Sequence, residues 1–267
     1  MIAYVVPIQG EPELWPSLGE YDVYDELLYY AMTHDEVRNR AYQAAIGRCV
    51  SGKVALDIGT GADALLARFC VEGGARHVYA IEVDETAYRR ARRLIDDLGL
   101  ADRITLLYGD SAQVQVPERV DVCVSEILGT IGSSEGAVSI LNDARRFLKH
   151  DGTMIPRRCV TLFAPVSLPA NLASPRLTGL PRVYVEQVFR KAGRPFDLRM
   201  CVKNFPQSSI LAQPQSFEDL DFTGYVPPEY EFRTRFTIDV ASRVAGFLFW
   251  LKLYPSHDEF IESLNGK

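Results

Sequence analysis

A glycine-rich turn beside an acidic residue is the first feature of this sequence that could do chemistry. The segment DIGTG, residues 57–61, closes an apolar run that starts at Val54 and leads into a helical pattern from Ala62. Two glycines allow a tight turn and let a ligand approach the backbone, while a helix start offers free N–H groups. In open α/β sheets, ligands bind at this place, outside the carboxyl ends of the strands. The turn therefore predicts a binding site.

The same turn fits two cofactor patterns. Residues 59–64 match G-x-G-x-x-A, which is typical of dinucleotide-binding folds, and Glu82 at the end of the next predicted strand would bind an adenosine ribose in either case. Asp57 distinguishes between the two cofactor patterns. Its carboxylate at the strand tip would repel the pyrophosphate of a dinucleotide but suits the ammonium of a methionine moiety. The pattern is similar to the S-adenosyl-L-methionine site of class I methyltransferases, where Gly109-Asp110-Ser111 would line the adenine.

Two carboxylates nine residues apart form a second candidate site. Glu126 follows the fourth predicted strand, and the loop from there to Glu135, ILGTIGSSE, is apolar and small and has no basic partner. Beside a sulfonium cofactor, two carboxylates could hold a cation, and a planar guanidinium with five N–H donors is the side chain that matches such a pair best. Alternatively, Glu135 is a first-turn acid of the next helix and complements its dipole.

Alternating strand-like and helix-like segments must position these residues. Short apolar runs predict strands, and the segments between them have helical periods. The predicted strands are Val54–Ile58, His77–Glu82, Ile104–Tyr108 and Val120–Ser125, and the predicted helices span residues 62–70, 85–98 and 138–150. This alternation indicates βαβ units and a parallel sheet covered on both faces. The strand-end acids then lie in one crevice.

The sequence changes character on either side of this region. After residue 155, strand-like runs at 153–165, 182–189, 231–240 and 245–254 are separated by connectors with proline and glycine, which indicates an antiparallel β unit. Upstream, residues 21–46 have a helical period, with a possible N-cap at Thr33 or His34 that divides them into two helices. We therefore expect helices, then a doubly wound sheet, then a β domain.

Composition narrows the class of protein. The 267 residues are 47% hydrophobic and 24% charged, as in globular proteins, and the net charge of -6 provides no global positive field for nucleic acid or anionic lipid. Five widely spaced cysteines without metal-ligand spacing argue against a disulfide framework and a structural zinc site. The N-terminus does not resemble a signal peptide, and no apolar stretch is long enough to span a membrane. We expect a cytoplasmic protein that binds neither nucleic acid nor membranes.

Several motifs together resemble one family. Residues 32–42, MTHDEVRNRAY, resemble the M-x-x-D-x-x-R-x-x-x-Y helix of the protein arginine N-methyltransferases. The segment from Ser125 to Glu135 resembles that family's double-E loop, with the same offset between the two acids. The order of motifs is also the family's, ending in a β domain that opens at residues 154–157 (MIPR). The resemblance covers residues 21 to about 165 well, and the remainder in its general β character.

The resemblance implies a fold and a division of the chain. The fold class is α/β, with a doubly wound, mostly parallel, seven-stranded-type Rossmann-like domain that binds S-adenosyl-L-methionine. Residues 1–46 would form the N-terminal segment and helices over the cofactor site, and residues 47–155 the cofactor domain. Residues 156–267 would form an antiparallel, barrel-like β domain for the substrate, which is either incomplete at its C-terminal end or that of a short member of the family.

The resemblance also implies a role for each site residue. Arg38 would pair with the cofactor carboxylate, and Met32 would pack near its sulfur. Asp57, Gly59 and Gly61 would hold the methionine part of the cofactor. Glu82 would bind the ribose, and Asp110 and Ser111 would flank the adenine. Glu126 and Glu135 would clamp the substrate guanidinium. Alternatively, Met32 is a core side chain and Arg38 is an i,i+3 partner of Asp35.

The implied activity is methyl transfer to an arginine or guanidine nitrogen of a protein, a peptide or a small molecule, with S-adenosyl-L-homocysteine as the cofactor product and without a metal. The alternatives are a methyltransferase for a different nucleophile and a scaffold module without turnover. The family's Thr-His-Trp loop has no match, because His257 lies in a different context and the sequence stops at Lys267, about where that loop would follow. A homodimer is expected, with an arm drawn from residues 167–181 or 190–222.

Overall fold

A computed structural model shows how these segments fold. It describes residues 1–5, 10–16, 33–129, 131–172, 177, 179–196, 200–238 and 241–264. Met32 and most of the first predicted helix lie outside the described residues. In the described part of the chain, no helix is both long and apolar enough to cross a membrane, and all five cysteines carry free thiols.

A five-stranded parallel sheet forms the first half of the described chain. Its strands are β3 (Val54–Ile58), β4 (His77–Glu82), β5 (Ile104–Tyr108), β6 (Val120–Ser125) and β7 (Leu148–Ile155). They are ordered β5-β4-β3-β6-β7, and each neighbouring pair is parallel. The chain runs outward from β3 to β5 and then returns to β6 on the other side of β3. The sheet therefore has its switch point between β3 and β6, where ligands bind in folds of this type.

Helices cover this sheet and complete its core. They are α3 (Leu65–Glu72), α4 (Glu85–Asp97) and α5 (Ala137–Ala144). All five residues of β3 are buried, as expected of a central strand with both faces covered. Asp84 caps α4, because its side chain accepts a hydrogen bond from the N–H of Ala87. The doubly wound α/β fold predicted from the sequence is confirmed.

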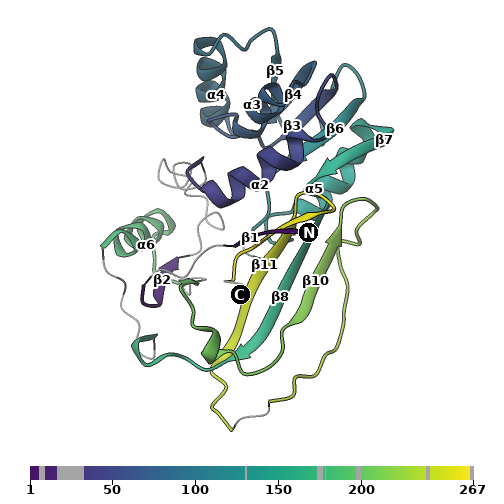
Figure 1. Cartoon of the computed structure of the whole chain (residues 1–267). Helices are drawn as coiled ribbons and strands as arrows, with labels where there is room; N and C mark the ends of the chain where they lie inside the picture. Colours follow the sequence, from purple (N-terminus) through teal and green to yellow (C-terminus); the bar gives the residue numbers. More distant parts are fainter. Residues whose placement is uncertain are drawn as a thin grey trace.

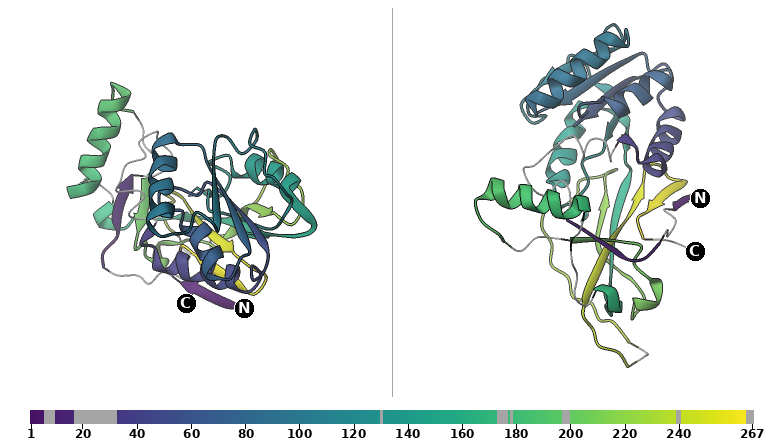
Figure 2. Two further views of the ribbon diagram at one scale, coloured as in Figure 1. Left: turned by 90° about the horizontal axis from the view of Figure 1, so that it is seen from above. Right: turned by 90° about the vertical axis from the view of Figure 1, so that its left-hand side faces the viewer.

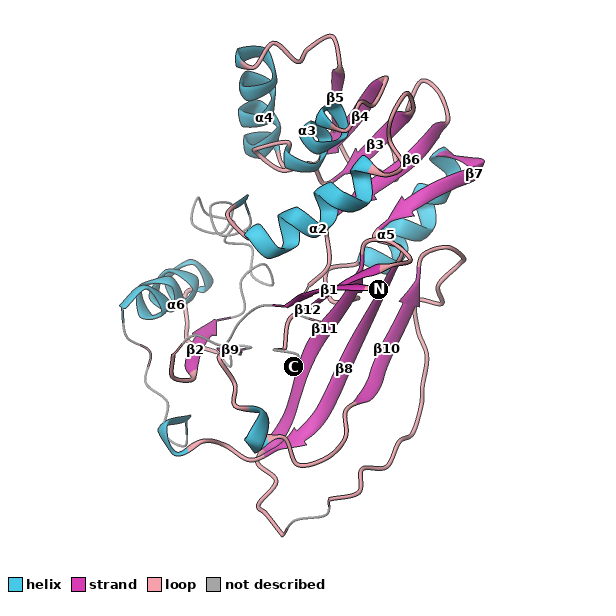
Figure 3. Ribbon diagram, in the orientation of Figure 1, coloured by secondary structure: helices cyan, strands magenta, loops and turns pink. Residues whose placement is uncertain are grey.

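A second sheet lies beyond the first, and α2 (Glu36–Gly47) lies between them (Figure 1). Its strands are β1 (Ile2–Val5), β8 (Arg158–Val166), β10 (Gln215–Asp221), β11 (Gly246–Tyr254) and β12 (Glu259–Glu262), in the order β1-β12-β11-β8-β10. All pairs are antiparallel except β1 with β12. The long strands β8, β10 and β11 run side by side (Figure 3). A separate antiparallel pair joins β2 (Glu13–Pro16) and β9 (Met200–Lys203).

One predicted strand is wrong. Residues 182–189 belong to a helix, α6 (Gly179–Ala192), which stands to the side of both sheets (Figure 2). The sequence RVYVEQVF is rich in β-branched and aromatic residues, but its buried members Tyr184, Val185 and Val188 are spaced at helical intervals. Arg182 and Glu186 also form an i,i+4 ion pair along the helix. Burial on one helical face therefore prevailed over strand propensity.

Other predicted boundaries also require correction. The helix expected over residues 138–150 ends at Ala144, and β7 already begins at Leu148 after a turn of 3-10 helix. The strand expected over residues 153–165 is two strands, β7 and β8, separated at Pro156 and Arg157. The strand expected over residues 231–240 is also wrong in its described part, because residues 231–238 are assigned to no strand. The N-cap of α2 is Asp35, not Thr33 or His34 as expected.

Candidate functional site

The turn after β3 is built around a buried carboxylate. Asp57 is fully buried, and its Oδ2 accepts hydrogen bonds from Thr60 Oγ1 at 2.6 Å and from the N–H of Ala67 at 3.0 Å. Its other oxygen, Oδ1, is also buried and has no hydrogen-bond partner among the described residues. The turn therefore holds one carboxylate oxygen in place and leaves the second unsatisfied.

Burial controls the charge of this group. It raises the pKa of Asp57 from its ordinary value to about 7, because an apolar environment disfavours the charged form. The hydrogen bonds from Thr60 and Ala67 act in the opposite direction, and the nearby Glu82 raises the pKa further. A cation bound near Asp57 would favour its ionised form. A bound ammonium group would therefore lower the cost of ionising Asp57.

Glu82 ties the glycine turn to the tip of the next strand. Its Oε2 accepts a hydrogen bond from the N–H of Gly61 at 2.8 Å, and its Oε1 accepts one from the N–H of Asp84 at 2.8 Å. Gly59 and Gly61 both have positive φ, +73° and +68°, which glycine adopts without strain. Because each carboxylate oxygen can accept more than one hydrogen bond, Glu82 keeps acceptor capacity for ligand hydroxyls.

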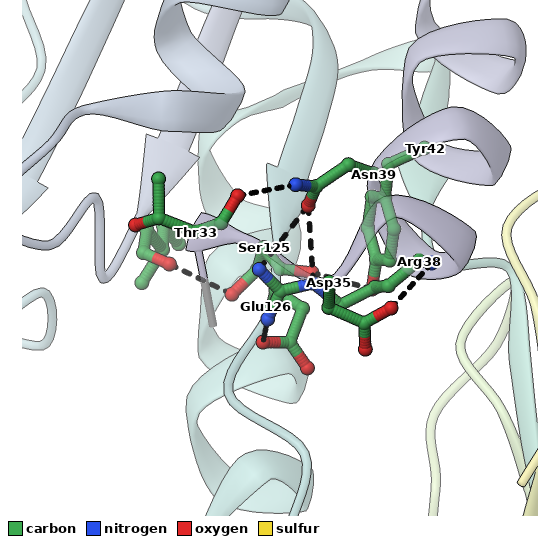
Figure 4. A network of polar contacts seen from close by, with 8 residues as sticks. Thr33, Asp35, Arg38, Asn39, Tyr42, Ser125 and Glu126 are labelled. Atoms are coloured by element: carbon green, nitrogen blue, oxygen red, sulfur yellow. Dashed lines mark hydrogen bonds and ion pairs between the residues drawn. The ribbon is translucent and has the colours of Figure 1, made fainter. Parts of the chain in front are cut away.

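An ion pair joins α2 to the end of β6 (Figure 4). Arg38 Nη1 lies 2.7 Å from Glu126 Oε2, and the two side chains are only 14% and 18% exposed. Burial raises the pKa of Glu126, and the pairing with Arg38 opposes this shift. The alternative of Arg38 as an ion-pair partner of Asp35 is not what the structure shows, since Asp35 accepts the backbone N–H of Arg38 instead. The guanidinium is thus directed at the strand-end acid.

Further contacts fix α2 in this position (Figure 4). Asn39 donates to the carbonyl of Thr33 at 2.7 Å and accepts from Arg38 Nε at 3.4 Å. The buried hydroxyl of Tyr42 donates to the carbonyl of Ser125 at 3.2 Å. Arg38 is therefore held by its own helix as well as by Glu126.

One pocket brings several predicted site residues together. Its lining includes Arg38, Gly59, Gly61 and Glu126, and Asp57 is buried in the turn that forms it. Asp110 and Ser111 are not in this lining. They follow β5 on an exposed turn in which Asp110 accepts the N–H of Ala112, and Gly109 at its start donates to the carbonyl of Glu82. The ends of β3, β4, β5 and β6 thus meet at one edge of the sheet.

Glu135 lies on the loop after β6, but outside the next helix. That helix, α5, starts at Ala137 with Gly136 as its N-cap and has no acid in its first turn. The alternative of a first-turn helix acid is therefore wrong. The side chain lies against Gly129 of the same loop, where an added Cβ would come within 3.2 Å of Glu135 Oε1. Glu135 is partly exposed and is not in the lining that contains Glu126.

The structure adds three residues that were not predicted as site residues from the sequence. Thr60 could have been found, because a hydroxyl three residues after Asp57 is a common partner for a carboxylate in a turn. Asp63 and Thr33 line the pocket, and Thr33 Oγ1 donates to Asp63 Oδ2 at 2.5 Å. These two residues are 30 positions apart, so no local pattern could have linked them.

The donor set fits a cofactor with an amino acid end and a ribose. Arg38 offers a cation for a carboxylate, and Asp57 offers a buried, unsatisfied oxygen for an ammonium. Gly59 leaves no room for a side chain, because an added Cβ would lie 2.8 Å from Ile127 Cγ2. The glycine turn and the loop that carries Glu126 and Glu135 are therefore in direct contact. In the described residues, no cluster of three or more His, Cys, Asp or Glu side chains could hold a metal ion.

Comparison with known proteins gives a consistent family. Residues 17–155 match the family model described as PRMT5 arginine-N-methyltransferase. The chain is 29% identical over 245 residues to the probable histone-arginine methyltransferase 1.4 of Arabidopsis thaliana, and 31% identical over 245 residues to the probable histone-arginine methyltransferase CARM1 of Oryza sativa subsp. indica. Each match covers 86% of this chain and 46% of the relative. The chain therefore spans about half the length of these relatives.

Solved structures share the fold. Protein arginine methyltransferase 10 of Arabidopsis thaliana, in an open conformation, superimposes with a TM-score of 0.67 at 22% identity, over 86% of this chain and 73% of that one. The PRMT1 enzyme-prozyme heterotetramer of Trypanosoma brucei, in complex with AdoHcy, gives a TM-score of 0.58 at 21% identity, over 74% and 62% of the two chains.

The raised pKa of Asp57 predicts how stability depends on pH. Between about pH 4 and 7 the folded state keeps a proton that the unfolded state releases, so the free energy of unfolding should fall as the pH rises through this window. The slope from this group is at most about 1.4 kcal/mol per pH unit. Asp57→Asn has no titrating group at this position, so its free energy of unfolding should increase relative to that of the wild type as the pH rises through this window. Urea unfolding at several pH values measures the difference.

The exposed residue Asp97 on α4 provides the control. Asp97→Asn should give a pH profile parallel to that of the wild type. Parallel profiles for Asp57→Asn as well would contradict a buried, proton-binding Asp57.

Proposed function

Since the chain belongs to the arginine N-methyltransferase family, we propose that it transfers a methyl group from S-adenosyl-L-methionine to an arginine or guanidine nitrogen of a protein, peptide or small molecule. The observation that carries this proposal is the meeting, at one edge of the parallel sheet, of the Asp57 turn and the Arg38–Glu126 pair. The names of the relatives favour arginine in a protein such as a histone as the substrate.

The residues at the strand ends would divide the cofactor among them. Arg38 would pair with its carboxylate, while Asp57, Gly59 and Gly61 would hold the rest of the methionine part. Glu82 would accept the ribose hydroxyls, and Asp110 and Ser111 would flank the adenine. Met32 would lie near the sulfur. When bound, this cofactor supplies a methyl group on a positively charged sulfur, which is already activated for transfer.

The loop after β6 would hold the substrate. Glu126 and Glu135 would each accept hydrogen bonds from the guanidinium and align one terminal nitrogen for attack. Charge-assisted hydrogen bonds of this kind are stronger than neutral ones and are directional. The guanidinium can lose its proton after the methyl transfer, so the transfer itself needs no general base. Positioning and electrostatics would then supply most of the acceleration.

Three further features belong to the same proposal. We propose a homodimer, with an arm from residues 167–181 or 190–222, and the position of α6 to the side of both sheets supports an arm in this region (Figure 2). We propose domain boundaries at residues 46/47 and 155/156, and the end of the parallel sheet at Ile155 supports the second of them. A cytoplasmic location is also part of the proposal and rests on the composition of the chain.

Cofactor binding tests the first part of the proposal. S-adenosyl-L-homocysteine should bind the purified protein, and Glu82→Ala should weaken it by about 1 to 3 kcal/mol, because ligand hydroxyls would lose their acceptor. Titration calorimetry measures both values. Glu118→Ala is the control, since Glu118 pairs with Arg76 away from the glycine turn and its loss should leave the affinity unchanged. Tight NAD binding without binding of the homocysteine product would refute the assignment.

Substitution of Glu135 tests the substrate role. Glu135→Gln should reduce turnover on arginine-rich peptides about 100- to 1000-fold, because one charge-assisted contact to the reacting group is lost. The dissociation constant of S-adenosyl-L-methionine should stay within about twofold of the wild-type value. Glu126 is a poorer probe, because its substitution also breaks the ion pair with Arg38. A labelled-methyl assay together with calorimetry makes the distinction.

Glu118→Gln, in the exposed pair with Arg76, is the matched control and should leave turnover unchanged. Undiminished turnover in Glu135→Gln would point instead to a methyltransferase for a different nucleophile. A protein that binds the cofactor but transfers no methyl group to any arginine substrate would favour the scaffold alternative.

A further inference from the structure

A buried carboxylate of the antiparallel sheet supports the loop that carries Glu126 and Glu135. Glu218 on β10 is 3% exposed and accepts two hydrogen bonds from Ser133, one from its N–H at 3.0 Å and one from its hydroxyl at 2.6 Å. Thr161 on β8 donates a third, at 2.6 Å. Thr161 also accepts the N–H of Gly132 at 3.1 Å. Two successive amides of the loop are thus bound by side chains of the other sheet.

A β-bulge places Glu218 there. In the pairing of β10 with β8, Ser216 lies opposite Leu162 and Glu218 opposite Thr161, so that Phe217 is the extra residue. Such a bulge re-aims the side chains that follow it. Glu218 is buried beside its cross-strand partner Thr161, whereas the next residue, Asp219, is exposed and pairs with Arg158.

The loop lies in direct contact with the sheet. An added Cβ at Gly132 would come within 2.8 Å of Cys159 Sγ and 3.0 Å of Glu218 Oε1, so a larger residue does not fit. The next residues form a turn in which Gly136 donates to the carbonyl of Ser133 at 3.1 Å. Glu135 is the third residue of this turn. A shift of Ser133 would therefore move Glu135 with it.

Burying the carboxylate of Glu218 costs free energy, which its hydrogen bonds to the loop partly offset. A buried carboxylate is expensive, and no described Lys or Arg forms an ion pair with Glu218, whose three donors are all neutral. Two of those donors belong to the loop residue Ser133, so most of the compensation for burying Glu218 comes from the loop itself. The carboxylate and the position of the loop are thus coupled.

We propose that Glu218 is a positioning residue for methyl transfer, which through Ser133 holds the turn of residues 133–136 and so aims the carboxylate of Glu135 at the substrate guanidinium. This rests on the proposed function of the Glu126–Glu135 loop. Glu218 touches neither substrate nor cofactor in this role, and the β domain thereby sets the geometry of an acid that belongs to the parallel-sheet half of the chain.

Four variants test the proposal. Glu218→Ala removes all three acceptor contacts and should lower kcat about 100-fold, the scale for a misplacement of about 1 Å in a catalytic group. Glu218→Gln keeps the size of the side chain and one acceptor oxygen, and should restore kcat to within about tenfold of wild type. Ser133→Ala removes only the hydroxyl contact, and its kcat should lie between those of Glu218→Ala and Glu218→Gln. The control Asp219→Asn alters the adjacent, exposed residue and should leave kcat unchanged.

A double variant separates positioning from general stability. If Glu218 acts through Glu135, Glu218→Ala should cause less than a twofold further loss of kcat in a Glu135→Gln background, whereas independent effects would multiply. The affinity for S-adenosyl-L-homocysteine should stay within about twofold of wild type in every variant. Wild-type kcat in Glu218→Ala, or multiplied losses in the double variant, would overturn the proposal. If Glu218→Ala does not fold, Ser133→Ala in the Glu135→Gln background makes the same test.

Hydrogen exchange distinguishes failure of this proposal from failure of the proposed function. The Ser133 amide should exchange at least about tenfold faster in Glu218→Ala, or in Glu218→Gln if the alanine variant does not fold, and at the wild-type rate in Asp219→Asn. Unchanged exchange would refute the tether itself. A wild-type protein that methylates no guanidine substrate but shows the faster exchange would refute the catalytic role and leave the tether established.

Discussion

The partly buried ion pair between Arg38 and Glu126 is the contact on which the arrangement of the site depends. It connects α2 to the loop after β6, and α2 is the element that lies between the two sheets (Figure 1). Such a pair recovers the cost of removing two charges from water only when its geometry is good and other hydrogen bonds support it. Here the separation is 2.7 Å, and Asn39 and the capped start of α2 hold the arginine. The pair therefore fixes the helix and the loop relative to each other.

The strands and the position of the site could be predicted from the sequence because both are local properties. The strands β3, β4, β5 and β6 have the predicted bounds, since each is a short apolar run between turn residues. Asp57 is the penultimate residue of β3, Glu82 ends β4, and Glu126 directly follows β6. Once the strands are parallel, their carboxyl ends must meet at one edge, so a correct assignment of strands was sufficient to bring these acids together.

The contacts between distant parts of the chain could not be predicted in the same way. Arg38 and Glu126 are 88 residues apart, and Ser133 and Glu218 are 85 residues apart. No periodicity links such pairs, and a bulge at Phe217 decides that Glu218 faces inward. The error at α6 has a related cause, because RVYVEQVF fits both a strand and a helix by composition. Only the buried face formed by Tyr184, Val185 and Val188 separates the two, and that face depends on tertiary packing.

The balance of charge at the sheet edge explains which ligands the site can favour. Asp57 and Glu126 are both removed from water, and burial raises the pKa of each. Arg38 is the single cationic side chain among the residues that line their pocket in the described chain, and it is shared with Glu126. An anionic ligand would add to this unfavourable burial of negative charge. The exception is a single ligand carboxylate, which could pair with Arg38. A ligand with an ammonium or sulfonium, followed by a guanidinium, would instead supply the charge that the buried carboxylates lack. Desolvation therefore makes these acids costly in their charged form, and a cation close to either of them lowers that cost.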